Sequence, residues 1–420
     1  MPPRPSAIVA SLLAWLLIPS IALAQSPTAA PCTAATAPQP PCEEPGFAAR
    51  VMDRYRALRL KGVTPMLGTI IPGASLSVGA ELRRERFFGI PAGASFEAMW
   101  SIRGYHEYDL RLGRIRGDRS RAELRPFDSS ITSVFSEGAL LAPGISAYVD
   151  LRQRVYPRVD FFGLGQQSDV KDRTDFGIKG TSIDGVVQWQ HNRHFGASAR
   201  AGTIDLSLEP GSNHGVPNLE DRFTADAAPG LIDPPRYRAL GLAAIVDYRD
   251  TPHLTSSGSW LGVAWWKASG IDQPADVGFM RIVTDVRQFV AVPNSDHVLA
   301  FRAIVSTRVG DDTVPTPFYL QPTLGGSKAL RGFGSYRLRG EAVWTATAEY
   351  RWHVQKWVEV APFVDVGAVA ARFSQLHDVR PAVSPGVGVR ARTKDRVVGR
   401  IDYAKGRDGQ RLILTVSAPF

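Results

Sequence analysis

Few residues of this sequence have the types and spacing that catalysis or metal binding requires. No Gly-x-Ser-x-Gly turn presents a nucleophilic serine, since the serines of "GTSIDG" and "GSWLG" stand at other offsets. His191 and His194 in "QHNRHFG" lie in a predicted tight turn without carboxylate or cysteine support. The glycines of "PTLGGSK" are not followed by a helix, so they predict no phosphate-binding loop. We therefore expect no catalytic residue, no metal site and no cofactor.

Charged residues instead alternate with apolar ones along many segments. "AVWTATAEYRW" places Glu349 and Arg351 on one face, and "VEVAPFVDVG" places Glu359 and Asp365 opposite a row of valines. The same period puts three more charges on that face: Arg390, Arg400 and Asp402. Charges on one face and aliphatic or aromatic residues on the other are typical of a transmembrane β-barrel with a polar lumen. A soluble two-layered sandwich is the alternative fold.

The alternating segments predict an all-β fold, a transmembrane antiparallel barrel of about 16 strands. The expected strands are 74–88, 93–102, 105–115, 130–141, 145–157, 178–191, 195–207, 236–249, 259–270, 277–292, 297–309, 341–354, 357–370, 382–392, 396–405 and 410–420. An even number fits bacterial single-chain barrels. Short connections such as "HNR" and "TKD" then fall on the periplasmic side, and the long segments near 158–177, 208–235 and 310–340 fall outside. Trp260, Trp352, Trp357 and Phe420 are expected at the membrane interfaces.

The first residues predict export. One arginine precedes an apolar stretch that ends in Ala-Leu-Ala before Gln25, the layout of a signal peptide over residues 1–24. A retained membrane anchor is the alternative. A flexible leader is expected over 25–46, and Cys32 and Cys42 within it could form a local disulfide in an oxidising compartment.

Residues 47–73 are predicted to form a short amphipathic helix and a linker before the barrel at 74–420. Phe47, Val51, Tyr55 and Leu58 recur at helical spacing. This helix could pack at the periplasmic rim or enter the pore as a plug.

Composition excludes several classes of protein. The chain has 420 residues, of which 44% are hydrophobic and 21% charged, so it is not a disordered chain. The mean hydropathy of −0.10 is no argument against a barrel, because only alternate residues of each strand face lipid. The net charge of +9 is spread among apolar residues, so we expect lumen and loop charges and no nucleic-acid partner.

One polar segment, "LGGSKALRGFGSYRLRGEAV" (324–343), ends the longest predicted external connection. Together with "FVDVG", "PGVGVR", "RIDYAKG" and the terminal Phe, it resembles the bacterial surface antigen superfamily of outer-membrane assembly and secretion barrels, with a BamA/TamA-like barrel domain. The resemblance extends upstream to "FFGLGQQSDVKDRT" and covers most of 74–420.

The resemblance implies roles for particular residues. The motif Leu330-Arg331-Gly332-Phe333 would fold back into the lumen, with Arg331 paired to the wall acid that Asp365 matches, and with Glu349 and Glu359 as further acidic residues. Lumen arginines at 351, 390 and 400 would complete a polar, water-containing interior. The pair of Arg331 and Asp365 could simply hold the loop in place, or it could take part in conformational switching. Phe420 resembles the terminal signal by which such barrels are recognised for assembly.

The resemblance also implies the cellular location and the function of the protein. We expect a bacterial outer-membrane protein that assists insertion or translocation of protein, or of lipid, with a gated or passive pore for small solutes as the alternative. A barrel enzyme such as a phospholipase is a third class. Expected partners are outer-membrane lipid and lipopolysaccharide, the barrel assembly machinery for its own insertion, and a periplasmic or secreted client. No βααββ pattern of a periplasmic POTRA domain precedes residue 74, so a member without POTRA domains is expected.

Overall fold

The computed structural model describes residues 62–84, 92–116, 129–135, 143–232, 234–271, 278–293, 296–310, 314–393, 397–415 and 420. The chain divides into two units, 1–52 and 53–420, and every described residue belongs to the second. The predicted signal peptide, the leader with Cys32 and Cys42, and the helical pattern up to residue 61 lie outside the described residues.

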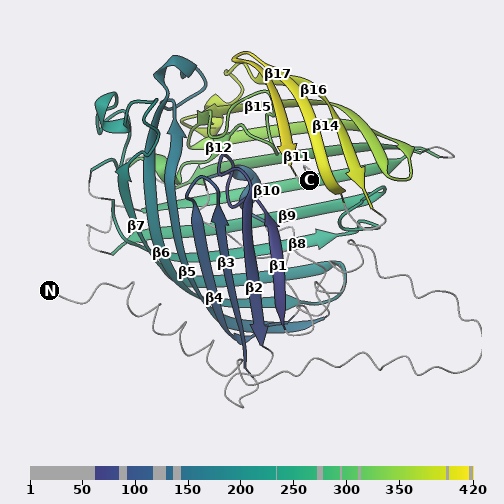
Figure 1. The fold of residues 1–420 in the computed structure, drawn as a ribbon. Helices are drawn as coiled ribbons and strands as arrows, with labels where there is room; N and C mark the ends of the chain where they lie inside the picture. Colours follow the sequence, from purple (N-terminus) through teal and green to yellow (C-terminus); the bar gives the residue numbers. More distant parts are fainter. Residues whose placement is uncertain are drawn as a thin grey trace, which may run out of the picture. The chain divides into compact units, whose positions relative to one another are not determined.

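Sixteen antiparallel strands follow one another around a single sheet (Figure 1). Neighbours in the sheet are neighbours in the sequence, except that β14 follows β11. The strands are β1 (Val63–Gly68), β2 (Ser77–Arg84), β3 (Gly93–Ser101), β4 (His106–Arg114), β5 (Gly144–Phe161), β6 (Thr174–Gln190), β7 (Phe195–Pro210), β8 (Tyr237–Asp247), β9 (Gly258–Gly270), β10 (Gly278–Ala291), β11 (His297–Val309), β14 (Ala342–Gln355), β15 (Val358–Ala370), β16 (Ala382–Arg392), β17 (Val397–Gly406) and β18 (Gly409–Thr415).

The connection between β11 and β14 contains a small ladder of its own, formed by β12 (Thr323–Leu324) and β13 (Leu338–Arg339). Short 3-10 turns punctuate this and other connections: η2 (Ile131–Ser133), η3 (Val170–Asp172), η4 (Leu219–Asp221), η5 (Phe318–Leu320) and η6 (Phe373–Gln375). None of the helices in the described part of the chain could cross a membrane, since none is long and apolar enough.

The predicted barrel of sixteen antiparallel strands is confirmed, but one predicted strand is absent and one observed strand was not predicted. Val63–Gly68 pairs with β2 from Val63–Leu82 to Gly68–Ser77, so the barrel begins before the predicted boundary at residue 74. The described part of the predicted strand 130–141 forms η2 instead, with Ile131 and Thr132 both buried. A 3-10 turn has no extended backbone, so it cannot pair as a strand of the wall.

The missing strand and the additional strand cancel in the strand count. The predicted direction of the strands between them is, however, the reverse of the observed one. The extra strand at 63–68 makes β2, β3 and β4 run opposite to the predicted sense. From β5 onward the predicted sense holds. The connection from β4 to β5 therefore belongs to the end that carries the short turns "HNR" and "TKD", the periplasmic end.

Alternation of exposed and buried side chains sets the two faces of the wall. Along β6, positions from Lys179 to Gln190 alternate strictly between exposed and buried, with apolar residues such as Ile183 and Val187 outward. β5 and β6 have 18 and 17 residues, more than the roughly 9–11 that cross a bilayer, so this hairpin projects beyond the outer surface.

The aromatic residues divide between the two faces. Trp352 and Trp357 are exposed on the outer face, where an interface girdle requires them. Trp260 is only 2% exposed and Phe420 is buried, so the predicted interfacial position of these two is wrong. Both rings face the lumen, where Trp260 stacks edge-on against Phe135 and Phe420 lies 5.9 Å from Phe289.

Candidate functional site

The described part of the connection between β11 and β14, here called the inner loop (residues 314–341), folds back against the lumen face of the wall. Gly325 and Gly326 have φ angles of 111° and 110°, in a region that residues with a Cβ rarely adopt. These angles reverse the chain after β12, and β13 then pairs back onto it, Thr323 with Arg339 and Leu324 with Leu338. The reversal presents the Leu330–Phe333 motif to β14, β15 and β17.

Arg331 is 1% exposed and makes the central contact of the motif. Its Nε and Nη2 donate to the two carboxylate oxygens of Asp365 on β15, at 2.9 and 2.8 Å, and its backbone N–H donates to the same carboxylate at 2.9 Å. Its Nη1 donates to Glu349 Oε1 on β14 at 2.8 Å. The guanidinium also lies over the ring of Phe363. A planar fork on a carboxylate fixes orientation as well as charge, which lysine could not reproduce.

Three guanidinium groups share Glu349. Besides Arg331, it accepts two hydrogen bonds at 2.8 Å from Arg390 Nη2 on β16 and one at 3.0 Å from Arg351 Nε on its own strand. Arg390 reaches on to Glu359, whose Oε1 lies 2.6 Å from its Nη1. Two strands, β14 and β16, and the inner loop are thereby tied through Glu349, and Glu359 adds β15.

Arg400 and Asp402 on β17 complete the group, here called the lumen ion cluster. Asp402 lies 3.5 Å from Arg331 and 3.3 Å from Arg400, whose Nη2 donates to the carbonyl oxygen of Ser327 in the inner loop. The cluster holds four arginines and four carboxylates, all buried, so its formal charges balance: Arg331, Arg351, Arg390, Arg400, Glu349, Glu359, Asp365 and Asp402. Removing one member would leave a buried opposite charge uncompensated, at a cost of about 3–5 kcal/mol.

The other motif residues fix the loop without charge. Leu330 and Phe333 are fully buried in the apolar core. Gly332 passes so close to β17 that a Cβ at this position would lie 2.5 Å from the carbonyl carbon of Lys405. Its backbone N–H donates to Ser384 Oγ on β16 at 2.6 Å. A glycine is required here because of close backbone approach, not because of an unusual φ.

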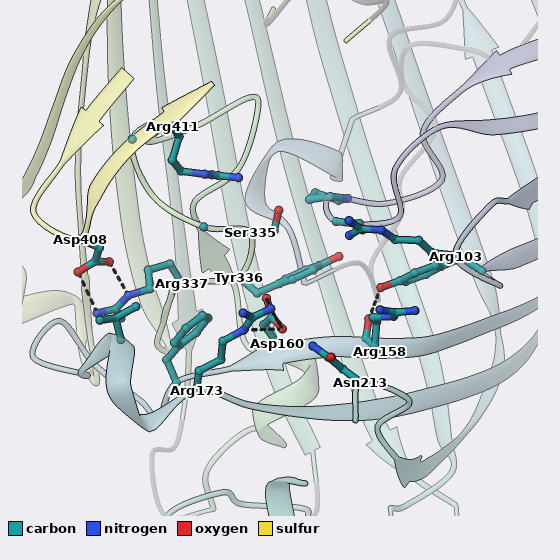
Figure 2. A pocket seen from close by; sticks show the side chains of 17 residues that line it. Arg103, Arg158, Asp160, Arg173, Asn213, Ser335, Tyr336, Arg337, Asp408 and Arg411 are labelled. Carbon is teal, nitrogen blue, oxygen red and sulfur yellow. Dashed lines mark hydrogen bonds and ion pairs between the residues drawn. The ribbon is translucent and has the colours of Figure 1, made fainter. Parts of the chain in front are cut away.

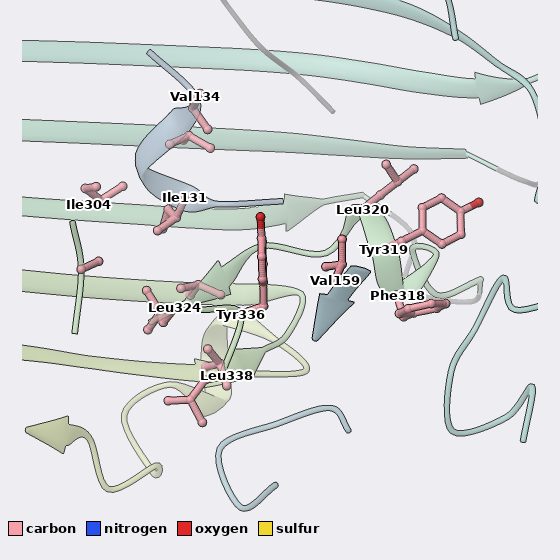
Figure 3. Close-up of a cluster of buried hydrophobic side chains, with 14 of the residues drawn as sticks. Ile131, Val134, Val159, Ile304, Phe318, Tyr319, Leu320, Leu324, Tyr336 and Leu338 are labelled. Carbon is pink, nitrogen blue, oxygen red and sulfur yellow. The ribbon is translucent and has the colours of Figure 1, made fainter. Parts of the chain in front are cut away.

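A second segment reaches the inner loop from the periplasmic connection between β4 and β5. This lumen segment, Ser129–Phe135, lies beside β12: the Thr323 backbone N–H donates to the carbonyl oxygen of Ser129 at 2.8 Å, and Ser130 bridges Thr323 in parallel. Figure 3 shows Ile131 on η2 and Val134 just after it near Ile304, Leu324 and Tyr336, and all five belong to one buried apolar cluster. This segment had been predicted as part of the strand 130–141; its consecutive apolar and small polar residues were the available signal against a strand.

The expectation of a uniformly polar, water-containing lumen is wrong on one side. The apolar cluster joins the inner loop and the lumen segment to inward residues of β8 and β9, among them Ala239, Ile245, Trp260 and Trp266. The wall from β14 to β17 carries the lumen ion cluster. The inner loop thus contacts both a group of buried charges and an apolar cluster.

Some other charges of the wall pair with one another, whereas Arg281 on β10 and Arg308 on β11 pair with Glu341 of the inner loop, at 3.2 and 3.6 Å. Arg152 and Arg200 bridge carboxylates of β4, β5 and β6, and Asp285 on β10 lies between Arg287 and Arg302. In the described residues no group of three or more histidines, cysteines or acids is placed to bind a metal ion. His194 instead stacks on Tyr248.

The ends of the sheet form a seam. The order of strands begins at β1 and ends at β18, and within the described ranges no ladder joins them. β1 has six residues and β18 has seven. A cavity of about 930 Å³ lies at this edge, bordered by Gly68 and Leu76 on one side and by Leu412 to Thr415 on the other.

Comparisons with known proteins agree with this architecture. Residues 233–410 match the Omp85 superfamily domain. No curated protein matches the chain. Among solved structures, BamA from Haemophilus ducreyi lacking POTRA domains 1–3 is similar at 13% identity, with a TM-score of 0.56 over 88% of this chain and 77% of that one. CdiB from Escherichia coli is similar at 10% identity, with a TM-score of 0.47 over 85% of this chain and 63% of CdiB.

Proposed function

We propose that this chain, a bacterial outer-membrane β-barrel that carries an Omp85 superfamily domain, assists the insertion or translocation of protein at the outer membrane. The observation that carries the proposal is the seam, where β1 and β18 face a cavity without a ladder between them in the described residues. The proteins to which the chain is similar suggest the same class of role.

An edge strand offers a row of backbone N–H and C=O groups to any extended segment that reaches it. A client strand could add to such an edge by main-chain hydrogen bonds, as in strand augmentation generally. The outward residues of β18, Leu412 and Leu414, are 67% and 72% exposed and would keep a paired client in contact with lipid. In a variant of this proposal, the molecule that moves along the same edge is a lipid rather than a protein strand.

A passive pore for small solutes is less well supported. The inner loop and the lumen segment pack together with inward residues of β8 and β9 in one apolar cluster. Apolar side chains packed at interior density leave little room for water. A solute pathway would require these two segments to move.

The test uses the full chain in proteoliposomes with an unfolded eight-stranded outer-membrane barrel as client. A photoreactive phenylalanine replaces Leu412 at the seam or, as the matched control, Leu242 on β8, which is also outward and 48% exposed. We expect faster client folding than in empty liposomes and crosslinks to the client from position 412 but not from 242.

Equal crosslinking from both positions, or no acceleration of client folding, would contradict an insertion role. A large steady conductance of the unmodified chain in planar bilayers would favour the pore instead.

A further inference from the structure

A second cavity, of about 460 Å³, lies at the extracellular end of the barrel (Figure 2). The β1–β2 and β3–β4 connections, the end of β5, the inner loop and the start of β18 all contribute to it. Among the residues that line it are five arginines and two aspartates: Arg103, Arg158, Arg173, Arg337, Arg411, Asp160 and Asp408. The lining therefore has a formal excess of three positive charges.

The two aspartates are already engaged. Arg173 Nη2 lies 3.1 Å from both oxygens of Asp160, and Arg337 Nε lies 2.6 Å from Asp408 Oδ2. Figure 2 shows these two pairs at the wall of the cavity. They stabilise its rim and leave no carboxylate of the lining for the other arginines.

The other three arginines, in the described ranges, have no carboxylate within ion-pair distance. Arg103 donates to the carbonyl oxygen of Gly73 at 3.2 Å, and Arg411 donates to that of Phe333. Arg158 Nε is buried and has no hydrogen-bond partner. Guanidinium groups that line one cavity and have no ion-paired carboxylate favour an anion there, and their planar forks suit phosphate.

Tyr105 holds Arg158 in place. Its hydroxyl donates to the backbone carbonyl oxygen of Arg158. Burial raises the pKa of Tyr105 to about 12, so the phenol is neutral and adds no negative charge to the cavity.

This charged cavity continues into the seam. Five residues line both it and the cavity between β1 and β18: Pro72, Gly73, Arg103, Ser335 and Arg411. The seam cavity is bordered farther along by the outward apolar residues Leu76, Ile102, Val389, Ile401, Leu412 and Leu414. A cationic chamber thus opens onto an apolar cleft, which is the arrangement that suits a molecule with an anionic head and a hydrocarbon chain.

We propose that the extracellular end of the seam binds an anionic, phosphate-bearing amphiphile, with its headgroup at Arg103, Arg158 and Arg411 and its hydrocarbon chain along β18. The site goes beyond the proposed function, because its ligand would bind whether or not a client protein uses the seam.

The experiment titrates the full chain in amphipol with three probes: dodecyl phosphate, inorganic phosphate and dodecylphosphocholine. Dodecyl phosphate carries both the anion and the chain, inorganic phosphate only the anion, and dodecylphosphocholine a matched chain with a zwitterionic head. We expect dodecyl phosphate to bind at least about tenfold more tightly than either of the others, since two favourable contacts act together.

Two sets of variants separate the contacts. Arg158→Ala with Arg411→Ala should weaken dodecyl phosphate binding about tenfold or more, whereas the exposed Arg193→Ala in the periplasmic turn should leave it unchanged. Leu414→Ser should weaken dodecyl phosphate binding and leave inorganic phosphate unaffected. If the double variant fails to fold, as judged by heat-modifiable gel mobility, the exposed Arg103→Ala replaces it.

Two results would overturn the proposal. Equal affinities for dodecyl phosphate and inorganic phosphate would identify a site for free anions. Equal affinities for dodecyl phosphate and dodecylphosphocholine would identify an apolar cleft without a headgroup site. Neither result bears on client crosslinking from position 412, so this proposal and the proposed function fail separately.

Discussion

Ser129 and Thr323 lie 194 residues apart in the sequence and meet inside the barrel, where the Thr323 backbone N–H and Oγ1 donate to the Ser129 carbonyl oxygen at 2.8 and 3.0 Å. One residue comes from the periplasmic connection between β4 and β5, and the other from the inner loop. Two connections that enter from opposite ends of the barrel are therefore joined in its interior. The contact between these two connections leads to the first prediction, which concerns how the lumen is obstructed.

We expect the lumen segment to keep the barrel closed. Ile131→Asp would place a charge in the apolar cluster and should raise the single-channel conductance in planar bilayers, because the segment would leave the cluster. In a background with Cys32→Ser and Cys42→Ser, the pair Ser130→Cys and Thr323→Cys should form a disulfide that keeps conductance low. A conductance that does not differ between Ile131→Asp and the unmodified chain would show that this segment does not obstruct the lumen.

Replacing Arg331 should release the inner loop. Arg331→Ala leaves Asp365 and Glu349 buried without this partner, which should cost about 3–5 kcal/mol in the free energy of unfolding. Urea unfolding in lipid vesicles and heat-modifiable gel mobility measure the effect. Arg331→Lys should recover only part of it, because lysine lacks the fork. The exposed Arg193→Ala is the control; equal stabilities for Arg331→Ala and Arg193→Ala would exclude a locking role.

Glu349→Gln should destabilise the barrel more than Asp365→Asn. Both changes remove one negative charge and keep the side-chain shape, but Glu349 serves three guanidinium groups and Asp365 serves one. The difference in the free energy of unfolding should be about 1–3 kcal/mol. The reverse order in urea unfolding would mean that the loop pair, rather than the shared carboxylate, dominates the cluster.

Gly332→Ala and Gly334→Ala form a matched pair two residues apart. A Cβ at position 332 would lie 2.5 Å from backbone of β17, whereas a Cβ at position 334 would meet nothing within 4 Å. Gly332→Ala should displace the motif and lower the melting temperature, and Gly334→Ala should leave it nearly unchanged. Thermal unfolding followed by circular dichroism tests this, and equal melting temperatures would contradict the close approach to β17.

Phe420 can act as an assembly signal, as a packing residue, or as both. Its ring lies in a buried cluster with Phe289, Val298 and Ala300, so Phe420→Ala should destabilise the folded barrel by about 3–5 kcal/mol. Phe289→Ala removes the opposite ring and should destabilise similarly. If assembly in cells depends on Phe420 as a signal, only Phe420→Ala should also reduce outer-membrane yield. If Phe420→Ala and Phe289→Ala give equal outer-membrane yields, the role of Phe420 is packing and not recognition for assembly.

The period of the sequence alone determined the barrel and the lumen position of the ion-cluster residues, whereas the number of strands agreed only because one missed and one false strand cancelled. A strand in a barrel wall exposes alternate residues to lipid, so every wall segment carries this local pattern, and Glu349, Glu359 and Asp365 could be assigned a face without knowing their partners. Trp260 and Phe420 were misplaced because an aromatic ring suits both an interface and a packed interior.

Only the tertiary structure decided what fills and closes the barrel. Val63–Gly68 is too short to show a period, and its place as β1 depends on β2. The lumen segment has no period at all, because it is buried on all sides by residues distant in sequence. That no ladder joins β1 and β18 within the described residues depends on how sixteen strands curve together, since pairing between the two ends of a sheet is a property of the whole barrel and of no single segment.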